Sequence, residues 1–213
     1  MDSRALFSDQ LERGLAQIGI SATVEQQRQL VEYLILFEKW NKTYNLSAIR
    51  DREQMVSRHL LDSLVVLPII TGKRFIDVGT GGGLPGIPLS IMKPDCHFTL
   101  LDSNGKKTRF LFQVKTQLQL ANVQVENRRV ESFSPTELYD GVISRAFASL
   151  KDMVDGCHSL IANDGRFWAL KGVYPESELS DLTKHYNVES CHPLDVPGCD
   201  GERHLLELRR QPD

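Results

Sequence analysis

The first seventy residues carry apolar side chains at the spacing of an amphipathic α-helix. Apolar residues recur every three or four positions, at Leu30, Leu34, Phe37, Trp40 and Tyr44. Ser21 or Thr23 precedes this run as a candidate N-cap. A second helical stretch is predicted over about residues 53–67, with Pro68 near its end. The N-terminal part of the chain is therefore predicted to be helical.

From Arg74 onward, short apolar runs alternate with helical stretches. The expected strands are FIDVG, CHFTLLD, VQVEN, YDGVISRAF and GRFWALKG, and helices are expected at LPGIPLSIMK, at NGKKTRFLFQVKTQLQL and over about 150–161. Such alternation predicts βαβ units and a parallel sheet. Two final strands, 186–193 and 203–209, have no helix between them and are expected to pair antiparallel. We predict a helical N-terminal element over 1–72 and one α/β domain over 73–213.

Composition narrows the class of protein. The 213 residues are 41% hydrophobic and 25% charged, as in soluble globular proteins. The net charge of −3 and the pI of about 6.1 argue against a dedicated nucleic-acid-binding protein but leave room for a local basic patch. The N-terminus is polar, and the longest apolar run, 64–70, is too short to span a bilayer. We expect a cytoplasmic protein that does not enter a membrane.

The four cysteines carry no recognisable metal or redox motif. They stand at positions 96, 157, 191 and 199, without a C-x-x-C pair or zinc-finger spacing. We expect reduced thiols and no metal site.

The most informative stretch is F-I-D-V-G-T-G-G-G-L-P-G, residues 75–86. Glycine allows a positive φ and lets a ligand approach the bare main chain. The N–H groups at the start of the following helix can donate to polar ligand atoms. In open α/β sheets, ligands bind at the carboxyl ends of strands. The stretch therefore predicts a ligand-binding turn, the alternative being a tight turn without a ligand.

Two cofactors fit these glycines. Gly81, Gly83 and Gly86 match the G-x-G-x-x-G pattern of dinucleotide-binding proteins, including nicotinamide-dependent oxidoreductases. Gly79, Gly81 and Gly83, with Asp77 two residues before the first of them, match the pattern of S-adenosylmethionine-dependent methyltransferases. The second alignment is favoured because its first glycine stands at the predicted strand end. We find no Tyr/Lys or His constellation for hydride transfer.

Asp102 ends the next predicted strand. An acidic side chain at this place can accept hydrogen bonds from ribose hydroxyls. Both candidate cofactors contain a ribose, so Asp102 supports an adenosine ligand without choosing between them. Its alternative role is to cap the helix that begins near Asn104.

Basic residues gather near the same predicted edge. No acidic residue occurs between Asp102 and Glu126, and further cations stand at or near later strand ends. The residues predicted to bind RNA are Lys106, Lys107, Arg109, Arg128, Lys171 and Arg203. Any one of them could instead be a solvated surface charge. A basic rim without an intact cofactor turn would indicate an RNA-binding module that is not an enzyme, but this turn is intact.

Several motifs together identify a family. In order they are W-N-K-T-Y-N-L-S (40–47), R-H-L-L-D-S (58–63), the glycine stretch to Ile91, F-T-L-L-D-S (98–103), D-G-V-I-S-R-A-F-A-S-L (140–150) and A-L-K-G (169–172). From about residue 25 to 209 the chain closely resembles the bacterial ribosomal RNA small-subunit methyltransferase G family, also called glucose-inhibited division protein B. One departure is Gly82, where many relatives have proline.

This resemblance implies a Rossmann-like methyltransferase sheet and transfer of a methyl group from S-adenosylmethionine to N7 of one guanine in 16S rRNA, near the decoding centre. The implied partner is 16S rRNA in the small ribosomal subunit or its precursor, and a monomer is expected. The residues expected to bind the cofactor are Asp77, Gly79, Gly81, Leu84, Asp102, Val130, Glu131 and Arg145. A methyltransferase that acts on a small molecule or a protein is the alternative.

Guanine N7 has a lone pair and no proton to lose, so its methylation needs no general base. Catalysis would then rest on positioning and on the exclusion of water. Arg145, after the fourth strand, is the predicted catalytic residue, and its alternative role is an ion pair with Glu131 or Asp102. His59 shares a predicted helix face with Arg58 and Asp62, where it either packs or contacts RNA.

Overall fold

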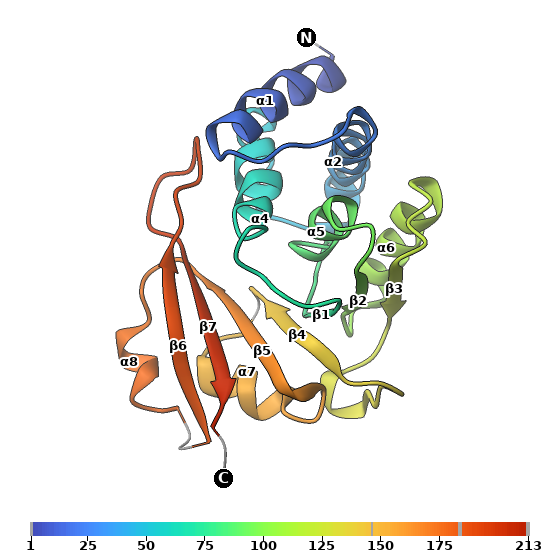
Figure 1. The fold of residues 1–213 in the computed structure, drawn as a ribbon. Coiled ribbons are helices and arrows are strands. Elements are labelled where there is room, and N and C mark those ends of the chain that lie inside the picture. The colour runs from blue at the N-terminus through green and yellow to red at the C-terminus, as the bar shows by residue number, and fades with distance from the viewer. Residues whose placement is uncertain (1, 146, 183–184, 212–213) are drawn as a thin grey trace.

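A computed structural model describes residues 2–145, 147–182 and 185–211 and contains one mixed sheet (Figure 1). Its seven strands lie in the order β3-β2-β1-β4-β5-β7-β6. They are β1 (Arg74–Val78), β2 (His97–Leu101), β3 (Val123–Glu126), β4 (Tyr139–Ser144), β5 (Ile161–Lys171), β6 (Tyr186–Pro193) and β7 (His204–Arg210). The first five strands pair parallel, and β7 pairs antiparallel with both β5 and β6. The predicted sheet, including its antiparallel end, is confirmed.

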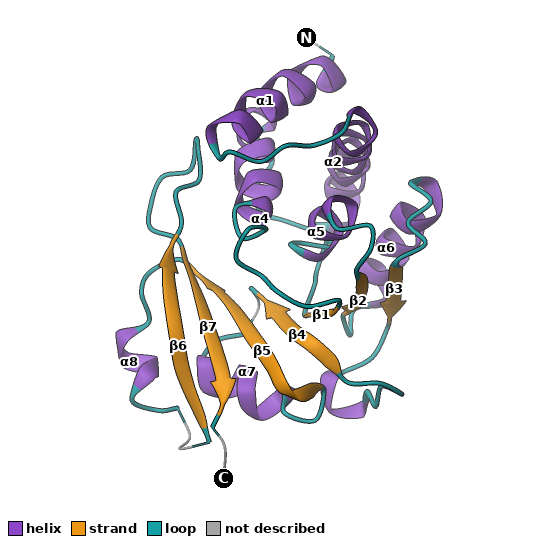
Figure 2. Ribbon diagram, viewed as in Figure 1, coloured by secondary structure: helices purple, strands orange, loops and turns teal. Residues whose placement is uncertain are grey.

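Helices cover both faces of this sheet (Figure 2). They are α1 (Ser3–Gln17), α2 (Val24–Tyr44), α3 (Arg52–Met55), the π-helix η1 (Val56–Leu61), α4 (Asp62–Leu64), α5 (Gly86–Met92), α6 (Gly105–Gln117), the 3₁₀-helix η2 (Val130–Ser132), α7 (Leu150–Cys157) and α8 (Glu176–Leu179). Thr23 caps α2 through a capping box with Gln26. Among the described residues, no helix combines the length and apolarity needed to cross a membrane.

Two predicted helices need correction. The stretch over 53–67 is helical only in pieces, because residues 56–61 form a π-helix between two short α-helices. Spacing of three or four residues does not distinguish a π turn from an α turn. The helix expected over 150–161 ends at Cys157, because Ile161 already pairs with Tyr139 of β4. The following strand therefore begins earlier than Gly165, with a register irregularity between Tyr139 and Gly141.

Successive side chains of the central strands pack alternately into two hydrophobic cores on opposite faces of the sheet. Phe75 of β1 belongs to the core under α5 and α6, whereas its neighbour Ile76 belongs to the core under α7. The first core also contains Phe7, Leu30 and Phe37 from α1 and α2. The N-terminal helices therefore pack on the same side of the sheet as α5 and α6. The division into 1–72 and 73–213 stays a prediction.

Candidate functional site

The order of the strands reverses at β1, which lies between β2 and β4. Such a switch point leaves a crevice at the carboxyl ends of the parallel strands. Two cavities open at this edge. The first cavity, of about 330 Å³, is lined by Val78, Gly79, Leu101, Asp102, Ser103, Lys107, Arg128, Arg129, Val130, Glu131 and Phe147. The second cavity, also of about 330 Å³, is lined by Asp62, Arg145, Leu170, Lys171, Gly172, Leu194, Arg203 and His204.

The glycine turn, residues 79–86, begins directly after the last residue of β1. Gly79, Gly81 and Gly83 have φ values of +70°, +61° and +91°, which side-chain-bearing residues rarely adopt. A Cβ at Gly81 would find no atom closer than 4.0 Å, whereas one at Gly83 would lie 2.6 Å from Ile87. Gly81 therefore leaves open space above the turn, and Gly83 is also required by packing below it.

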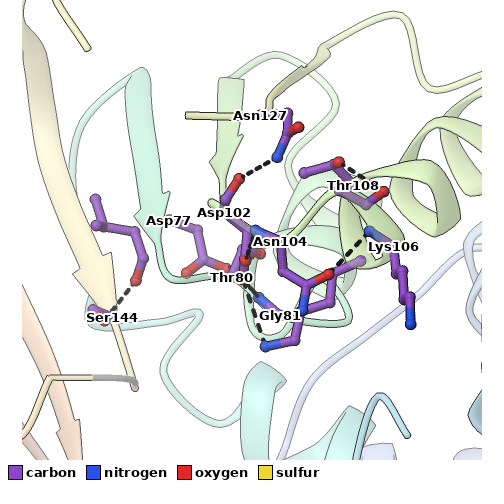
Figure 3. A network of polar contacts seen from close by, with 12 residues as sticks. Asp77, Thr80, Gly81, Asp102, Asn104, Lys106, Thr108, Asn127 and Ser144 are labelled. Atoms are coloured by element: carbon purple, nitrogen blue, oxygen red, sulfur yellow. Dashed lines mark hydrogen bonds and ion pairs between the residues drawn. The ribbon is translucent and has the colours of Figure 1, made fainter. Parts of the chain in front are cut away.

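Asp77 lies beneath this turn and does not line the first cavity. One carboxylate oxygen accepts a hydrogen bond from the hydroxyl of Thr80, which lies beside it in Figure 3, at 2.8 Å. The same oxygen accepts the Gly86 N–H at 2.9 Å. Burial raises the pKa of Asp77 to about 6, although both hydrogen bonds and the charge of Arg145 act in the opposite direction. Asp77 thus holds the shape of the turn, and any effect on a ligand passes through the backbone.

Asp102 does line the first cavity, at the end of β2. Its carboxylate accepts the Gly81 N–H at 2.9 Å and the Asn104 N–H at 2.8 Å (Figure 3). Each oxygen keeps further acceptor capacity, which fits a ligand with adjacent hydroxyl groups. The N-cap of α6 is Asn104, whose side chain accepts the Lys106 N–H, so the alternative capping role of Asp102 is wrong.

The remaining predicted cofactor residues separate into three places. Gly79, Val130 and Glu131 line the first cavity together with Asp102. Leu84 is buried in the core beside the turn and does not reach the cavity wall. Arg145 lines the second cavity. Phe147, which also lines the first cavity, was not predicted from the sequence, and its position after β4 was the one signal for it.

Arg145 takes part in an ion pair that joins distant segments. Its Nη1 donates to Asp62 Oδ2 at 2.7 Å, and Arg203 Nε donates to the other oxygen, Oδ1, at 3.0 Å. The alternative partners considered for Arg145, Glu131 and Asp102, are therefore wrong. Asp62 follows the π-helix η1, Arg145 follows β4, and Arg203 precedes β7. Sequence reasoning noted Asp62 only as a neighbour of His59.

The six predicted RNA-binding residues also divide between the cavities. Lys107 and Arg128 line the first cavity, where Lys107 Nζ lies 3.8 Å from Asp102 and Arg128 pairs with Glu126. Lys171 and Arg203 line the second. The other two predicted residues, Lys106 and Arg109, are exposed on α6. Four of the six cations therefore line the two cavities, two in each.

The N-terminal helices support the glycine turn from the side. The Tyr33 hydroxyl donates to the Gly82 carbonyl oxygen at 2.7 Å, and a Cβ at Gly82 would lie 2.4 Å from the ring of Phe37. The turn is thus packed tightly against α2 at Gly82. His59 packs against Phe37 with the rings tilted and their centroids 4.8 Å apart, and burial lowers the pKa of His59 to about 4. His59 therefore packs as a neutral side chain.

Comparisons with known proteins agree on one family. The model of a family described as rRNA small subunit methyltransferase G matches residues 26–206. A Ribosomal RNA small subunit methyltransferase G from Saccharophagus degradans is 60% identical over 205 residues, which are 96% of this chain and 92% of that protein. One from Enterobacter sp. (strain 638) is 56% identical, covering 94% of this chain and 97% of that protein.

Solved structures show the fold at much lower identity. The mitomycin 7-O-methyltransferase MmcR superposes with a TM-score of 0.61 at 15% identity, covering 99% of this chain and 69% of that chain. TrmN from Thermus thermophilus superposes with a TM-score of 0.57 at 14% identity, covering 80% and 53%. The Rossmann-like methyltransferase sheet expected from the sequence is confirmed.

Proposed function

This chain belongs to the rRNA small subunit methyltransferase G family, and we propose that it transfers a methyl group from S-adenosylmethionine to N7 of one guanine in 16S rRNA, near the decoding centre. The observation that carries the proposal is the first cavity. It lies at the switch point of a methyltransferase sheet, between the glycine turn and the carboxylate that ends β2. It is bordered by cations on its other side.

The residues of the first cavity fit S-adenosylmethionine. Asp102 has acceptor capacity for the two ribose hydroxyls, and the open space above Gly81 lets a ligand approach the main chain. Gly79, Val130 and Glu131 complete the wall. When bound, the cofactor supplies an electrophilic methyl group on a sulfonium. Asp77 and Leu84 contribute by holding the turn in place.

The protein's own task in this reaction is positioning. Guanine N7 attacks with its lone pair, and no proton has to be removed by a side chain. The methylated guanine becomes positively charged, so a bare cation beside it would be unfavourable. Arg145 is compensated by Asp62 and can orient the guanine by hydrogen bonds without adding a full positive charge. Arg145 is thus the proposed catalytic residue, acting by alignment.

The RNA partner is supported by the cations around both cavities, of which Lys107 and Arg128 line the first, and by Lys106 and Arg109, which are exposed on α6. Phosphate contacts from these side chains would set the register of the RNA on the protein. We further propose that the protein works as a cytoplasmic monomer on the small ribosomal subunit or its precursor.

The test is methyl transfer from labelled S-adenosylmethionine to small ribosomal subunits, or their precursors, from cells that lack this gene. We expect label in 16S rRNA at N7 of a single guanine, mapped by chain cleavage at the modified base. Absence of label in RNA, with tight binding of S-adenosylhomocysteine retained, would contradict the rRNA substrate. A small-molecule or protein acceptor would then be the better proposal.

A further inference from the structure

The second cavity lies beside the first across the end of β4. Arg145 lines the second cavity, and Phe147, two residues further along the chain, lines the first. A methyl acceptor has to approach the donor carbon to about 3–3.5 Å. The acceptor must therefore enter from a space that adjoins the cofactor cavity. The second cavity is such a space, and its volume of about 330 Å³ falls within the usual range of ligand pockets, about 300–1,000 Å³.

The charges of the second cavity favour an anionic ligand. One carboxylate, Asp62, holds two guanidinium groups, those of Arg145 and Arg203, through one oxygen each. The Asp62 side chain is only 13% exposed, whereas those of Arg145 and Arg203 are 30% and 25% exposed. Each guanidinium has five N–H donors, so both retain donors beyond the bond to Asp62. Together, Asp62, Arg145 and Arg203 carry a net positive charge, and the less exposed carboxylate fixes the orientation of both guanidinium groups.

Lys171 has a different role in this cavity. Its Nζ is bound to both oxygens of Glu178, at 3.1 and 2.9 Å, and lies 3.4 Å from the carbonyl oxygen of Phe147. Glu178 also accepts the N–H of Leu150 at 2.7 Å. The charge of Lys171 is therefore neutralised by Glu178, and its bond to the Phe147 carbonyl oxygen holds the segment after β4 that borders both cavities. The two arginines are left as the cations that can meet a ligand.

His204, which lines the same cavity, packs against a second aromatic ring that lies outside the lining. Tyr174, in the loop after β5, is 41% exposed, and its ring lies edge-on to that of His204 with centroids 5.7 Å apart. The Nδ1–H of His204 donates to the Gly172 carbonyl oxygen at 3.0 Å, which holds the imidazole ring in place. Exposed aromatic rings beside cationic groups are the usual means by which proteins hold unstacked RNA bases.

We propose that the second cavity receives the acceptor purine nucleotide after it has left the RNA stack. The exposed ring of Tyr174 stacks on the base with His204 edge-on behind it, Arg145 donates to the base edge, Arg203 contacts the adjoining phosphate, and Asp62 is the positioning residue for both arginines. This inference rests on the proposed function. It also explains how N7 is reached, because that atom is inaccessible to side chains in the deep, narrow major groove of an RNA helix.

The first experiment compares single-turnover methylation of unmodified small subunits by the wild type and by Tyr174→Ala. We expect the subunit concentration at half-maximal rate to rise at least about tenfold, as for loss of one stacking contact. Tyr174→Phe keeps the ring and should recover most of that loss. Tyr44→Ala is the matched control, because Tyr44 has a similar exposure of 40% at the end of α2. Equal kinetics for Tyr174→Ala and Tyr44→Ala would overturn the stacking role.

Asp62 is tested in the same assay. Asp62→Asn keeps the shape of the side chain but removes its charge. We expect a lower maximal rate together with a higher subunit concentration at half-maximal rate. Asp62→Glu should restore part of the rate because the carboxylate is retained. Binding of S-adenosylhomocysteine, followed by calorimetry, should stay within about twofold of the wild type in every variant. Loss of that binding, or an Asp62→Asn enzyme with wild-type rates, would overturn the positioning role.

A second measurement separates this inference from the proposed function. Guanosine 5′-monophosphate is added to the protein saturated with S-adenosylhomocysteine, and the imidazole signals of His204 are followed by NMR. We expect saturable shifts in the wild type and their loss in Tyr174→Ala. Nucleotide binding of this kind without methyl transfer to rRNA would overturn the rRNA substrate and leave the nucleotide pocket standing. Methyl transfer to rRNA that is unaffected by Tyr174→Ala, with no shift at His204, would support the rRNA substrate and overturn the nucleotide pocket.

Discussion

The two cavities at the sheet edge are built in different ways. The first is formed by consecutive turns after β1, β2 and β3, and its recognisable polar contacts involve main-chain N–H groups, such as that of Gly81. The second is formed by side chains whose anchor, Asp62, lies 83 positions before Arg145 and 141 positions before Arg203. One cavity therefore depends on backbone conformation, and the other depends on ion pairs between distant segments.

The two cavities should therefore respond differently to amino-acid substitutions. A backbone site is sensitive to any residue that cannot adopt its φ angles, and it is insensitive to the identity of many lining side chains. A site made of ion pairs loses its geometry when the shared carboxylate is removed, even though each arginine remains present. Substitutions chosen on this basis should affect one cavity without the other.

The largest effect is expected for Gly83→Ala. The positive φ of +91° and the contacts of 2.6 Å to Ile87 and 2.8 Å to Leu111 leave no room for a Cβ. We expect a loss of about 3 kcal/mol in the free energy of unfolding, measured by urea denaturation. The control is Gly81→Ala, where φ is also positive but the space is open. Equal destabilisation by both variants would contradict the distinction between packing and ligand approach.

A smaller and more local effect is expected for Asp102→Ala. Loss of an acceptor for the ribose hydroxyls should weaken binding of S-adenosylhomocysteine by about 10- to 100-fold, the equivalent of about 1.5–3 kcal/mol, in a calorimetric titration. Asp102→Asn keeps one acceptor oxygen and should lose less. Circular dichroism provides the control for the fold, since Asp102 also accepts the Gly81 and Asn104 N–H groups. Unchanged affinity would remove the ribose assignment.

A further effect concerns the binding of RNA. Reversing two charges with Lys106→Glu and Lys107→Glu should weaken binding of 16S rRNA fragments and reduce the slope of log affinity against log salt by about 1.5, as for two lost phosphate contacts. The charge-matched control is Arg13→Glu with Arg28→Glu, because these arginines pair within α1 and α2. If both double variants have the same slope, these lysines do not contact phosphate.

The smallest net effect is expected for pH, because two buried groups act in opposite directions. Burial raises the pKa of Asp77 from 3.8 to about 6, so its contribution to stability falls as pH rises from 4 to 6. Burial, with the charge of Arg145, lowers the pKa of His59 from 6.5 to about 4, so its contribution is lost as pH falls through that range. Each shift corresponds to about 3 kcal/mol, and the two should largely offset in the wild type.

Single variants separate the two contributions. With His59→Gln, the free energy of unfolding should fall as pH rises from 4 to 6, because the Asp77 linkage is left alone. With Asp77→Asn, it should rise over the same window, because the His59 linkage is left alone. Urea denaturation at a series of pH values measures both slopes. Parallel profiles for the wild type and both variants would contradict the assigned burial.

The amino-acid sequence by itself determined the local features of this protein. The period of apolar residues predicted the helices and strands, the glycine stretch predicted the turn after β1, and the ordered motifs identified the family. These signals are local because backbone conformation and hydrogen bonding act between neighbouring residues. The same reasoning missed the π-helix over 56–61, whose apolar spacing does not differ from that of an α-helix, and the early start of β5, which depends on pairing with β4.

Only the tertiary structure decided how side chains far apart in the chain meet. It placed Asp77 beneath the turn, Arg145 in the second cavity, and Asp62 between Arg145 and Arg203. No pattern within any one segment specifies such contacts, because an ion pair depends on the distance and burial of its partners after packing, and not on their separation in sequence. The backbone of the first cavity was therefore predictable, and the side-chain cluster of the second cavity was not.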